Sequence, residues 1–139
     1  MSEENKQLLQ RWFQQVWNEQ NQGTIDELFS AEGKVHNFPE TGGVLVGPAG
    51  FKEIHKNFCG AFPDIHVIVE DVISEGDRVA AHWTATMTHL GDHLGVPSTG
   101  KKVVLPGSSF CIIRDGKIAE AWNHIDMGHL FKQIAVTQA

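Results

Sequence analysis

Apolar residues recur at helical spacing in the first part of the chain and at strand spacing in the second. Between residues 8 and 17 they fall on one broad helical face, which predicts a first helix. Thr24 and Glu27 have the spacing of a capping box, which predicts a short second helix. A third helix is predicted to begin at Gly47-Pro48, where proline suits the first turn. The chain therefore opens with helices.

Two hairpins are predicted in the second part of the chain, around the turns Gly76-Asp77 and Asp115-Gly116. The predicted strands are 35–38, 66–74, 78–89, 103–114 and 117–125, and a last helix is predicted at 127–134. Because helices come first and a strand meander follows, the predicted fold class is α+β. We expect one domain over residues 1–139, a curved antiparallel sheet wrapped by the N-terminal helices around an apolar pocket.

Composition narrows the classes of partner. The 139 residues carry a net charge of −6, so phosphate backbones and anionic membranes are disfavoured, and we expect no nucleic acid and no membrane partner. No apolar run approaches the roughly 20 residues of a membrane span. Cys59 and Cys111 lie in apolar stretches behind a polar N-terminus, which indicates two reduced thiols in a cytoplasmic protein.

Candidate chemistry gathers near the end of the last strand. Side chains two apart on a strand share a face, so Trp122, His124 and Asp126 are expected to point the same way, with Ile118 and Glu120 before them. Trp83 and His89, on the other hairpin, are expected to face the same pocket. Burial of Asp126 beside tryptophan would disfavour its charged form and suit it to acid-base work. The alternative is that Asp126 only caps the last helix, and both roles can coexist.

Other histidines leave further alternatives open. His36 and Asn37 fit a pocket rim or a solvated loop, His89 a strand end, and His124 a core position. His36, His89, His124 and Asp126 could converge on a metal, but the chain lacks tight ligand spacings, so no metal is expected. No nucleophile elbow occurs, which argues against nucleophilic catalysis, and the chain has neither a Gly-rich phosphate loop nor a dinucleotide fingerprint.

An ordered set of motifs resembles a known family. The set comprises Phe62-Pro63-Asp64, 76–80, Thr88-His89-x-Gly91, 95–100, 114–122 and Asp126. Together these motifs resemble the SnoaL-like polyketide cyclase (ester cyclase) family of the nuclear transport factor 2-like superfamily. The resemblance runs from the first helix to Gln133. It implies a cone-shaped, cystatin-like α+β fold around a central pocket.

The resemblance also implies an activity and its residues. It implies cofactor-free intramolecular aldol ring closure in an aromatic polyketide ester. It implies Asp126 as general acid or base, His124 as its helper, and His36 or Asn37 as a polar residue of the first strand. Family members also carry polar residues near positions that match Phe110 and Ile112, where this chain is apolar.

We therefore expect a cytoplasmic enzyme that moves a proton next to a carbonyl of a hydrophobic small molecule. Trp83 and Trp122 would pack on the ligand, while His36 and His89 would contact its oxygens. Alternatives are a ketosteroid-isomerase-like isomerase, a non-catalytic binding protein, an interaction module and an epoxide hydrolase of the same superfamily. A homodimer is expected through the outer sheet face. That face would carry His82, Thr84, Thr86 and Thr88.

Overall fold

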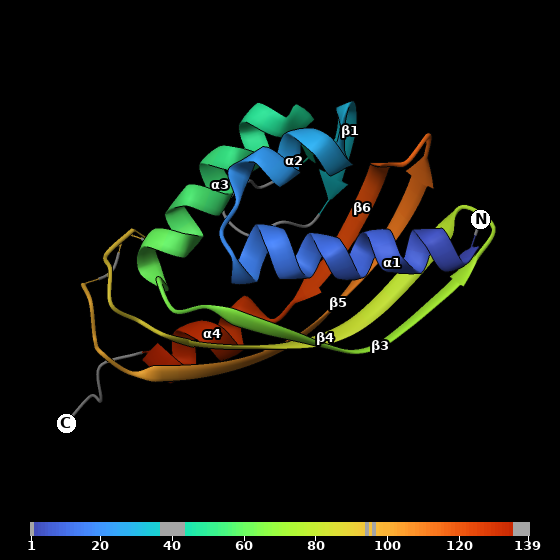
Figure 1. Ribbon diagram of the computed structural model, residues 1–139. Coiled ribbons are helices and arrows are strands. Elements are labelled where there is room, and N and C mark those ends of the chain that lie inside the picture. The colour runs from blue at the N-terminus through green and yellow to red at the C-terminus, as the bar shows by residue number, and fades with distance from the viewer. Residues whose placement is uncertain (1, 37–43, 94, 96, 135–139) are drawn as a thin grey trace.

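The computed structural model describes residues 2–36, 44–93, 95 and 97–134, which form one curved sheet and a set of helices (Figure 1). The helices are α1 (Ser2–Trp12), η1 (Phe13–Asn18), α2 (Gln22–Leu28), α3 (Gly47–Ala61) and α4 (Met127–Ile134). The strands are β1 (Phe29–His36), β2 (Val44–Val46), β3 (His66–Glu75), β4 (Arg78–Thr88), β5 (Lys102–Arg114) and β6 (Lys117–Ile125). The α+β fold class is confirmed.

The sheet has the strand order β2-β1-β6-β5-β4-β3. The two predicted hairpins form its larger part, and the residues at their turns, Gly76, Asp115 and Gly116, adopt the positive φ that such turns require. Every pairing is antiparallel except β1 with β6, which is parallel. β1 directly follows α2 and runs parallel to β6, whereas a hairpin partner would run antiparallel to it.

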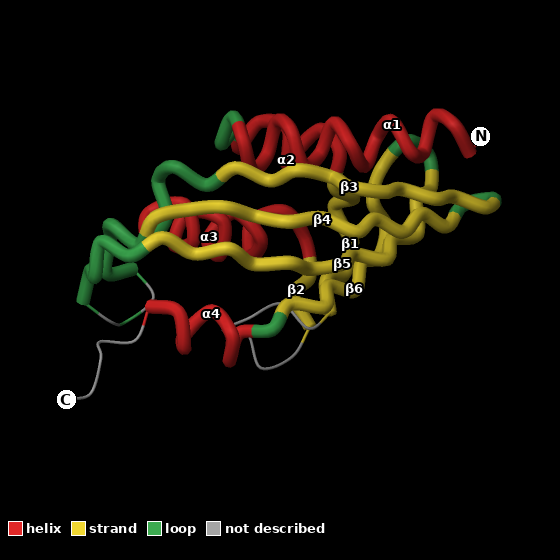
Figure 2. The backbone as a smooth tube through the Cα atoms, turned by 90° about the horizontal axis from the view of Figure 1, so that it is seen from below, coloured by secondary structure: helices red, strands yellow, loops and turns green. Residues whose placement is uncertain are grey.

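Helices α1, α2 and α3 cover one face of the sheet, and the core lies between the two layers (Figure 1). The opposite face of the central strands is turned toward the viewer in Figure 2, and α4 lies near its margin, packed on β5. Within the described part of the chain, no helix is long and apolar enough to cross a membrane.

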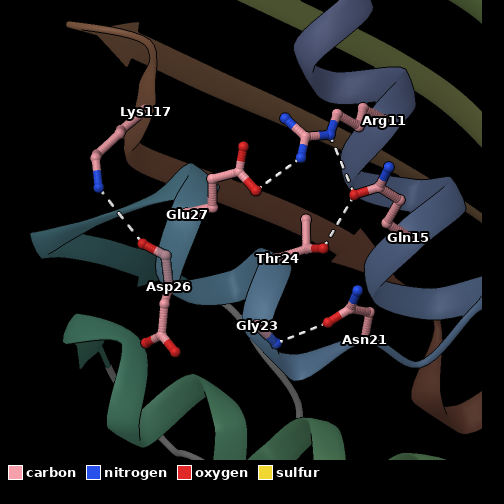
Figure 3. A network of polar contacts seen from close by, with 8 residues as sticks. All are labelled: Arg11, Gln15, Asn21, Gly23, Thr24, Asp26, Glu27 and Lys117. Atoms are coloured by element: carbon pink, nitrogen blue, oxygen red, sulfur yellow. Dashed lines mark hydrogen bonds and ion pairs between the residues drawn. The ribbon is translucent and has the colours of Figure 1, made fainter.

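Polar contacts join α1 and η1 to α2 (Figure 3). The Thr24 hydroxyl donates to Gln15 Oε1 at 3.0 Å, and Arg11 reaches Gln15 and Glu27 at 3.1 and 2.7 Å. The Asn21 side chain accepts from the amide of Gly23 at 2.9 Å and is the N-cap of α2. The predicted capping box at Thr24 is therefore wrong, because the Thr24 hydroxyl is engaged by η1 instead.

Strand boundaries in the first half also differ from the prediction. β1 begins at Phe29, six residues before the predicted strand at 35–38, and β2 was not predicted. Neither strand has strong alternation of its own: β1 is held in the sheet by pairing with β6, far along the chain, and β2 pairs with β1.

A β-bulge in β6 decides which side chains enter the core. Ile113 pairs with Ile118, but the preceding Ile112 pairs with Glu120, so Ala119 is an extra residue on β6. An extra residue reverses the inward and outward alternation that follows it. Ile118 therefore faces the core, Glu120 faces outward, and the rest of the strand is shifted relative to the period-two prediction.

Candidate functional site

An apolar pocket lies between the helices and the inner face of the sheet. Its empty volume is about 730 Å³, a figure that includes space open to solvent. Aromatic side chains form much of its wall. They are Trp12, Phe13, Trp17, Phe29, Phe51, Phe58 and Trp83. The helical face predicted from residues 8–17 supplies three of them, and this arrangement suits a hydrophobic ligand.

A short polar relay interrupts the apolar wall. The indole Nε1 of Trp83 donates to Ser109 Oγ at 3.1 Å, and Ser109 Oγ donates to Asn123 Oδ1 at 2.6 Å. Ser109 and Asn123 are paired across β5 and β6, and all three residues line the pocket. The pocket therefore offers hydrogen bonds at one place and apolar contacts elsewhere.

Trp83 is the one predicted ligand-contacting tryptophan that lies in the pocket wall. Trp122 lies on the outer face of β6, because the bulge at Ala119 reverses the alternation. His36 stacks on Trp122 with ring centroids 4.9 Å apart, and its Nε2 contacts Glu120 Oε2 at 2.6 Å. The expectation that Trp122 and His36 line the same pocket as Trp83 is therefore wrong.

His89 is fully buried but is not among the pocket-lining residues. Its Nδ1 contacts Thr99 Oγ1 at 3.0 Å, and its ring packs on Phe62 with centroids 5.6 Å apart. Within the described ranges, Nε2 of His89 has no hydrogen-bond partner. The expectation that His89 faces the pocket is therefore wrong, and its position fits a histidine of the structural core.

Asp126 and His124 are exposed, which contradicts the expected burial of Asp126 beside Trp122. Asp126 Oδ1 accepts from the amide of His129 at 2.9 Å, so the carboxylate caps α4, as the alternative reading predicted. Ile125, just before Asp126, lines the pocket. Asn37, the remaining predicted site residue, lies outside the described residues.

Sequence reasoning missed Ser109 and Asn123. The resemblance implied polar residues near the positions of Phe110 and Ile112, but both belong to the outer-facing set of β5, and Ser109 faces inward. The signal was present as a second alternation, Ala121-Asn123-Ile125, opposite Ser109. It could be chosen over Trp122-His124-Asp126 only with knowledge of the bulge.

Burial favours the neutral form of three ionisable side chains in the core, Cys111, Cys59 and His55. Burial raises the pKa of the Cys111 thiol, which lines the pocket, to about 12, and that of Cys59 to about 11. Burial lowers the pKa of His55, although its hydrogen bond to the Val16 carbonyl opposes the shift. Among the side chains that the structure describes, no three His, Cys, Asp or Glu residues come together to hold a metal ion.

Comparison with known proteins agrees with this geometry. The sequence model of the SnoaL-like polyketide cyclases matches residues 7–134. The chain belongs to the SnoaL-like polyketide cyclase family. Among curated proteins, none matches the chain.

Solved structures of candidate family members share the fold. One from Jannaschia sp. CCS1 is 23% identical, with a TM-score of 0.87 and coverage of 99% of this chain and 95% of that one. A candidate polyketide cyclase from Acidithiobacillus ferrooxidans is 28% identical, with a TM-score of 0.80 and coverage of 94% of each chain. Another from Bacillus cereus is 26% identical, with a TM-score of 0.80 and coverage of 97% of this chain and 83% of that one. Membership in the family supports a cyclase-type or isomerase-type protein.

Proposed function

We propose that this protein binds a hydrophobic carbonyl compound in the pocket and promotes aldol-type ring closure without a cofactor. The observation that carries the proposal is the Trp83–Ser109–Asn123 relay inside an otherwise apolar wall. Apolar walls can hold a flexible chain folded, with its reacting carbons close together, and exclude water. A single polar place would then fix one carbonyl oxygen.

The proposed reaction moves one proton and forms one bond. A base removes a hydrogen from the carbon beside the held carbonyl, and the electron pair of that C–H bond moves to give an enolate. The enolate carbon attacks a second carbonyl carbon of the same molecule, forming a C–C bond, and the new alkoxide takes up a proton. An amide N–H at the enolate oxygen stabilises the developing charge.

Asp126, with His124 two residues before it, is our proposed acid-base group, because Asp126 directly follows the pocket-lining Ile125 at the end of β6. In this role Asp126 would act from the end of β6 rather than from inside the pocket. Asn37, the other first-strand candidate of the sequence, remains a proposed substrate contact.

The test is hydrogen exchange at carbon next to a carbonyl. 2-Tetralone is a compact hydrophobic ketone, and in D₂O its α-hydrogens are replaced by deuterium, which NMR follows directly. We expect the protein to accelerate this exchange over buffer, and Asn123→Leu to slow it about 10²-fold through loss of the oxyanion donor. Ser108→Ala, on the opposite face of β5, is the control. Absence of acceleration by a protein that binds 2-tetralone would contradict catalysis.

A second candidate, a non-catalytic small-molecule binding protein, is favoured by one observation. Among the pocket-lining residues that the structure describes, none carries a carboxylate or an imidazole. Binding of 2-tetralone without accelerated exchange would support this candidate. Native mass spectrometry of protein purified without added ligand would then reveal what the pocket retains.

Assembly and location are part of the same proposal. We propose a homodimer through the outer sheet face, where His82 and Thr86 are exposed and no described helix covers the central strands. We also propose a cytoplasmic location, which the two free, buried thiols Cys59 and Cys111 support.

A further inference from the structure

The hydrogen bonds of the pocket relay run in one direction. An indole N–H can only donate, so Ser109 Oγ accepts from Trp83 at 3.1 Å. The Ser109 hydroxyl donates its own hydrogen to Asn123 Oδ1 at 2.6 Å, and this occupies the amide oxygen. Over the described part of the chain, the Asn123 Nδ2 group has no hydrogen-bond partner, and Asn123 lines the pocket.

The opposite orientation of the Asn123 amide is disfavoured. It would place Nδ2 against Ser109 Oγ, which already accepts the indole hydrogen. Asn123 Oδ1 is the acceptor that the Ser109 hydroxyl uses among the described residues, so the turned amide would take away this bond, although Ser109 is only 4% exposed. A buried donor without an acceptor is costly, so the relay holds the amide with its NH₂ group toward the pocket.

Gly107 makes room for the first member of the relay. Gly107 and Trp83 are directly paired across β4 and β5, and Gly107 shares the inner face of β5 with Ser109. A Cβ atom at position 107 would lie 2.4 Å from Trp83 Cη2, which is far inside van der Waals contact. Glycine therefore lets the indole lie against β5 with its N–H directed at Ser109.

We infer that the pocket selects ligands that present a hydrogen-bond acceptor, a carbonyl or enolate oxygen, to Asn123 Nδ2. Trp83, Ser109 and Gly107 are positioning residues that fix the direction of the amide. The inference rests on the proposed use of this pocket for a carbonyl compound and names the ligand atom that the site selects. An enolate oxygen, which carries more charge than a carbonyl, accepts a stronger hydrogen bond from the same donor.

The test uses three flat probes of nearly equal size: 9-fluorenone, which offers an acceptor, 9-fluorenol, which also offers a donor, and fluorene, which offers neither. 9-Fluorenone has no hydrogen on the carbon beside its carbonyl, so its binding is separate from the proposed proton transfer. Dissociation constants are measured by titration. The infrared C=O stretching frequency of bound 9-fluorenone reports directly whether its oxygen accepts a hydrogen bond.

The ratio of the fluorene dissociation constant to that of 9-fluorenone should be about fivefold larger for wild-type protein than for Asn123→Leu. This factor is the usual contribution of one hydrogen bond. Ser109→Ala should let the Asn123 amide turn, so that the affinity for 9-fluorenol rises relative to the affinity for 9-fluorenone. Gly107→Ala adds one carbon and no polar group, yet it should lower the preference for 9-fluorenone over fluorene, because it displaces Trp83. Ser108→Ala, on the outer side of β5, should behave as wild type. The C=O frequency should be lower in wild type than in Asn123→Leu.

Three results would separate the claims. A wild-type preference for 9-fluorenol over 9-fluorenone would overturn the assigned direction of the amide. Binding of all three probes with the C=O frequency of 9-fluorenone in hydrocarbon solvent would overturn the acceptor selection and leave pocket binding intact. Failure of every probe to bind would contradict the proposed function itself, and this inference with it. Comparison of the bound C=O frequency with that in hydrocarbon solvent needs only wild-type protein, so this test holds even if a variant fails to fold.

Discussion

The carboxylate of Asp126 has two oxygens with different surroundings. Oδ1 accepts the amide hydrogen of His129 at the start of α4. Among the described residues no side chain binds Oδ2, so that oxygen is open to solvent and to a ligand that reaches the end of β6. A helix cap and a proton acceptor can therefore coexist in one side chain.

Conservative and non-conservative changes at Asp126 separate these roles. Asp126→Asn keeps the cap and should leave the free energy of unfolding nearly unchanged, whereas Asp126→Ala should lower it by about 1 kcal/mol. If Asp126 is the base, Asp126→Asn should slow deuterium exchange of 2-tetralone by about 10²–10⁴-fold. His124→Ala should cost less, and the double variant should be scarcely slower than Asp126→Asn. Exchange by the Asn variant at the parent rate would leave only the cap.

His55 gives the fold a dependence on pH. It is 2% exposed, its Nε2 contacts the Val16 carbonyl at 2.6 Å, and burial lowers its pKa. The unfolded chain therefore takes up the proton first, and stability is lost as pH falls below the unfolded value of about 6.5. We expect the free energy of unfolding of wild type to fall more between pH 7.5 and 5.5 than that of His55→Gln. His66→Gln, at an exposed position, should keep the wild-type slope; a loss of slope there too would contradict the assignment.

At the scale of elements, the sequence predicted the features that depend on interactions between residues close together in the chain. The hairpin turns, the helix beginning at Gly47 and the α+β order follow from turn residues and apolar periodicity. The alternation of β6 could not be predicted, because the bulge at Ala119 depends on its register with β5. Because of that one extra residue, Trp122 lies on the outer face of the sheet and Asn123 lines the pocket.

Single-residue deletions test the bulge. Removing Ala119 should restore regular pairing and keep Ala121, Asn123 and Ile125 inward, so the protein should unfold cooperatively with modest loss of stability. Removing Ala121 instead should draw the Glu120 carboxylate toward the core, with a loss of about 3 kcal/mol or more, since a buried charge without a partner is strongly unfavourable. Chemical denaturation measures both. Equal stability of the two variants would contradict the bulge assignment.

At the scale of the whole molecule, the sheet has one face covered by helices and one central face without them (Figure 2). Apolar side chains stand on the uncovered strands. They include Ile73 and Val104, with exposed fractions of 66% and 52%, and Phe110, with 38%. Phe110 also packs edge-on against Trp122 with centroids 5.7 Å apart, and Trp122 carries the stacked His36. Exposed apolar residues gathered on one sheet face are typical of an interface.

A charge on this face should prevent the proposed homodimer. We expect light scattering at micromolar concentration to give twice the 15.4 kDa mass of one chain for wild type. Phe110→Lys should give a single chain, because it places a charge among apolar contacts. Ala49→Lys adds the same charge at an exposed position of α3 and should remain dimeric. A wild-type mass of one chain would contradict the dimer.

The indole N–H signals of the four tryptophans provide the most direct test that the inner pocket is the ligand site. Trp12, Trp17 and Trp83 line the pocket, whereas Trp122 lies on the outer face and serves as an internal control. Single Trp→Phe variants assign each signal in a ¹⁵N-correlated NMR spectrum, and 9-fluorenone is then titrated into wild-type protein. We predict saturable shifts of the Trp83 signal and its two pocket neighbours, with Trp122 unchanged. A shift confined to Trp122, or no shift in the three pocket signals, would contradict the account.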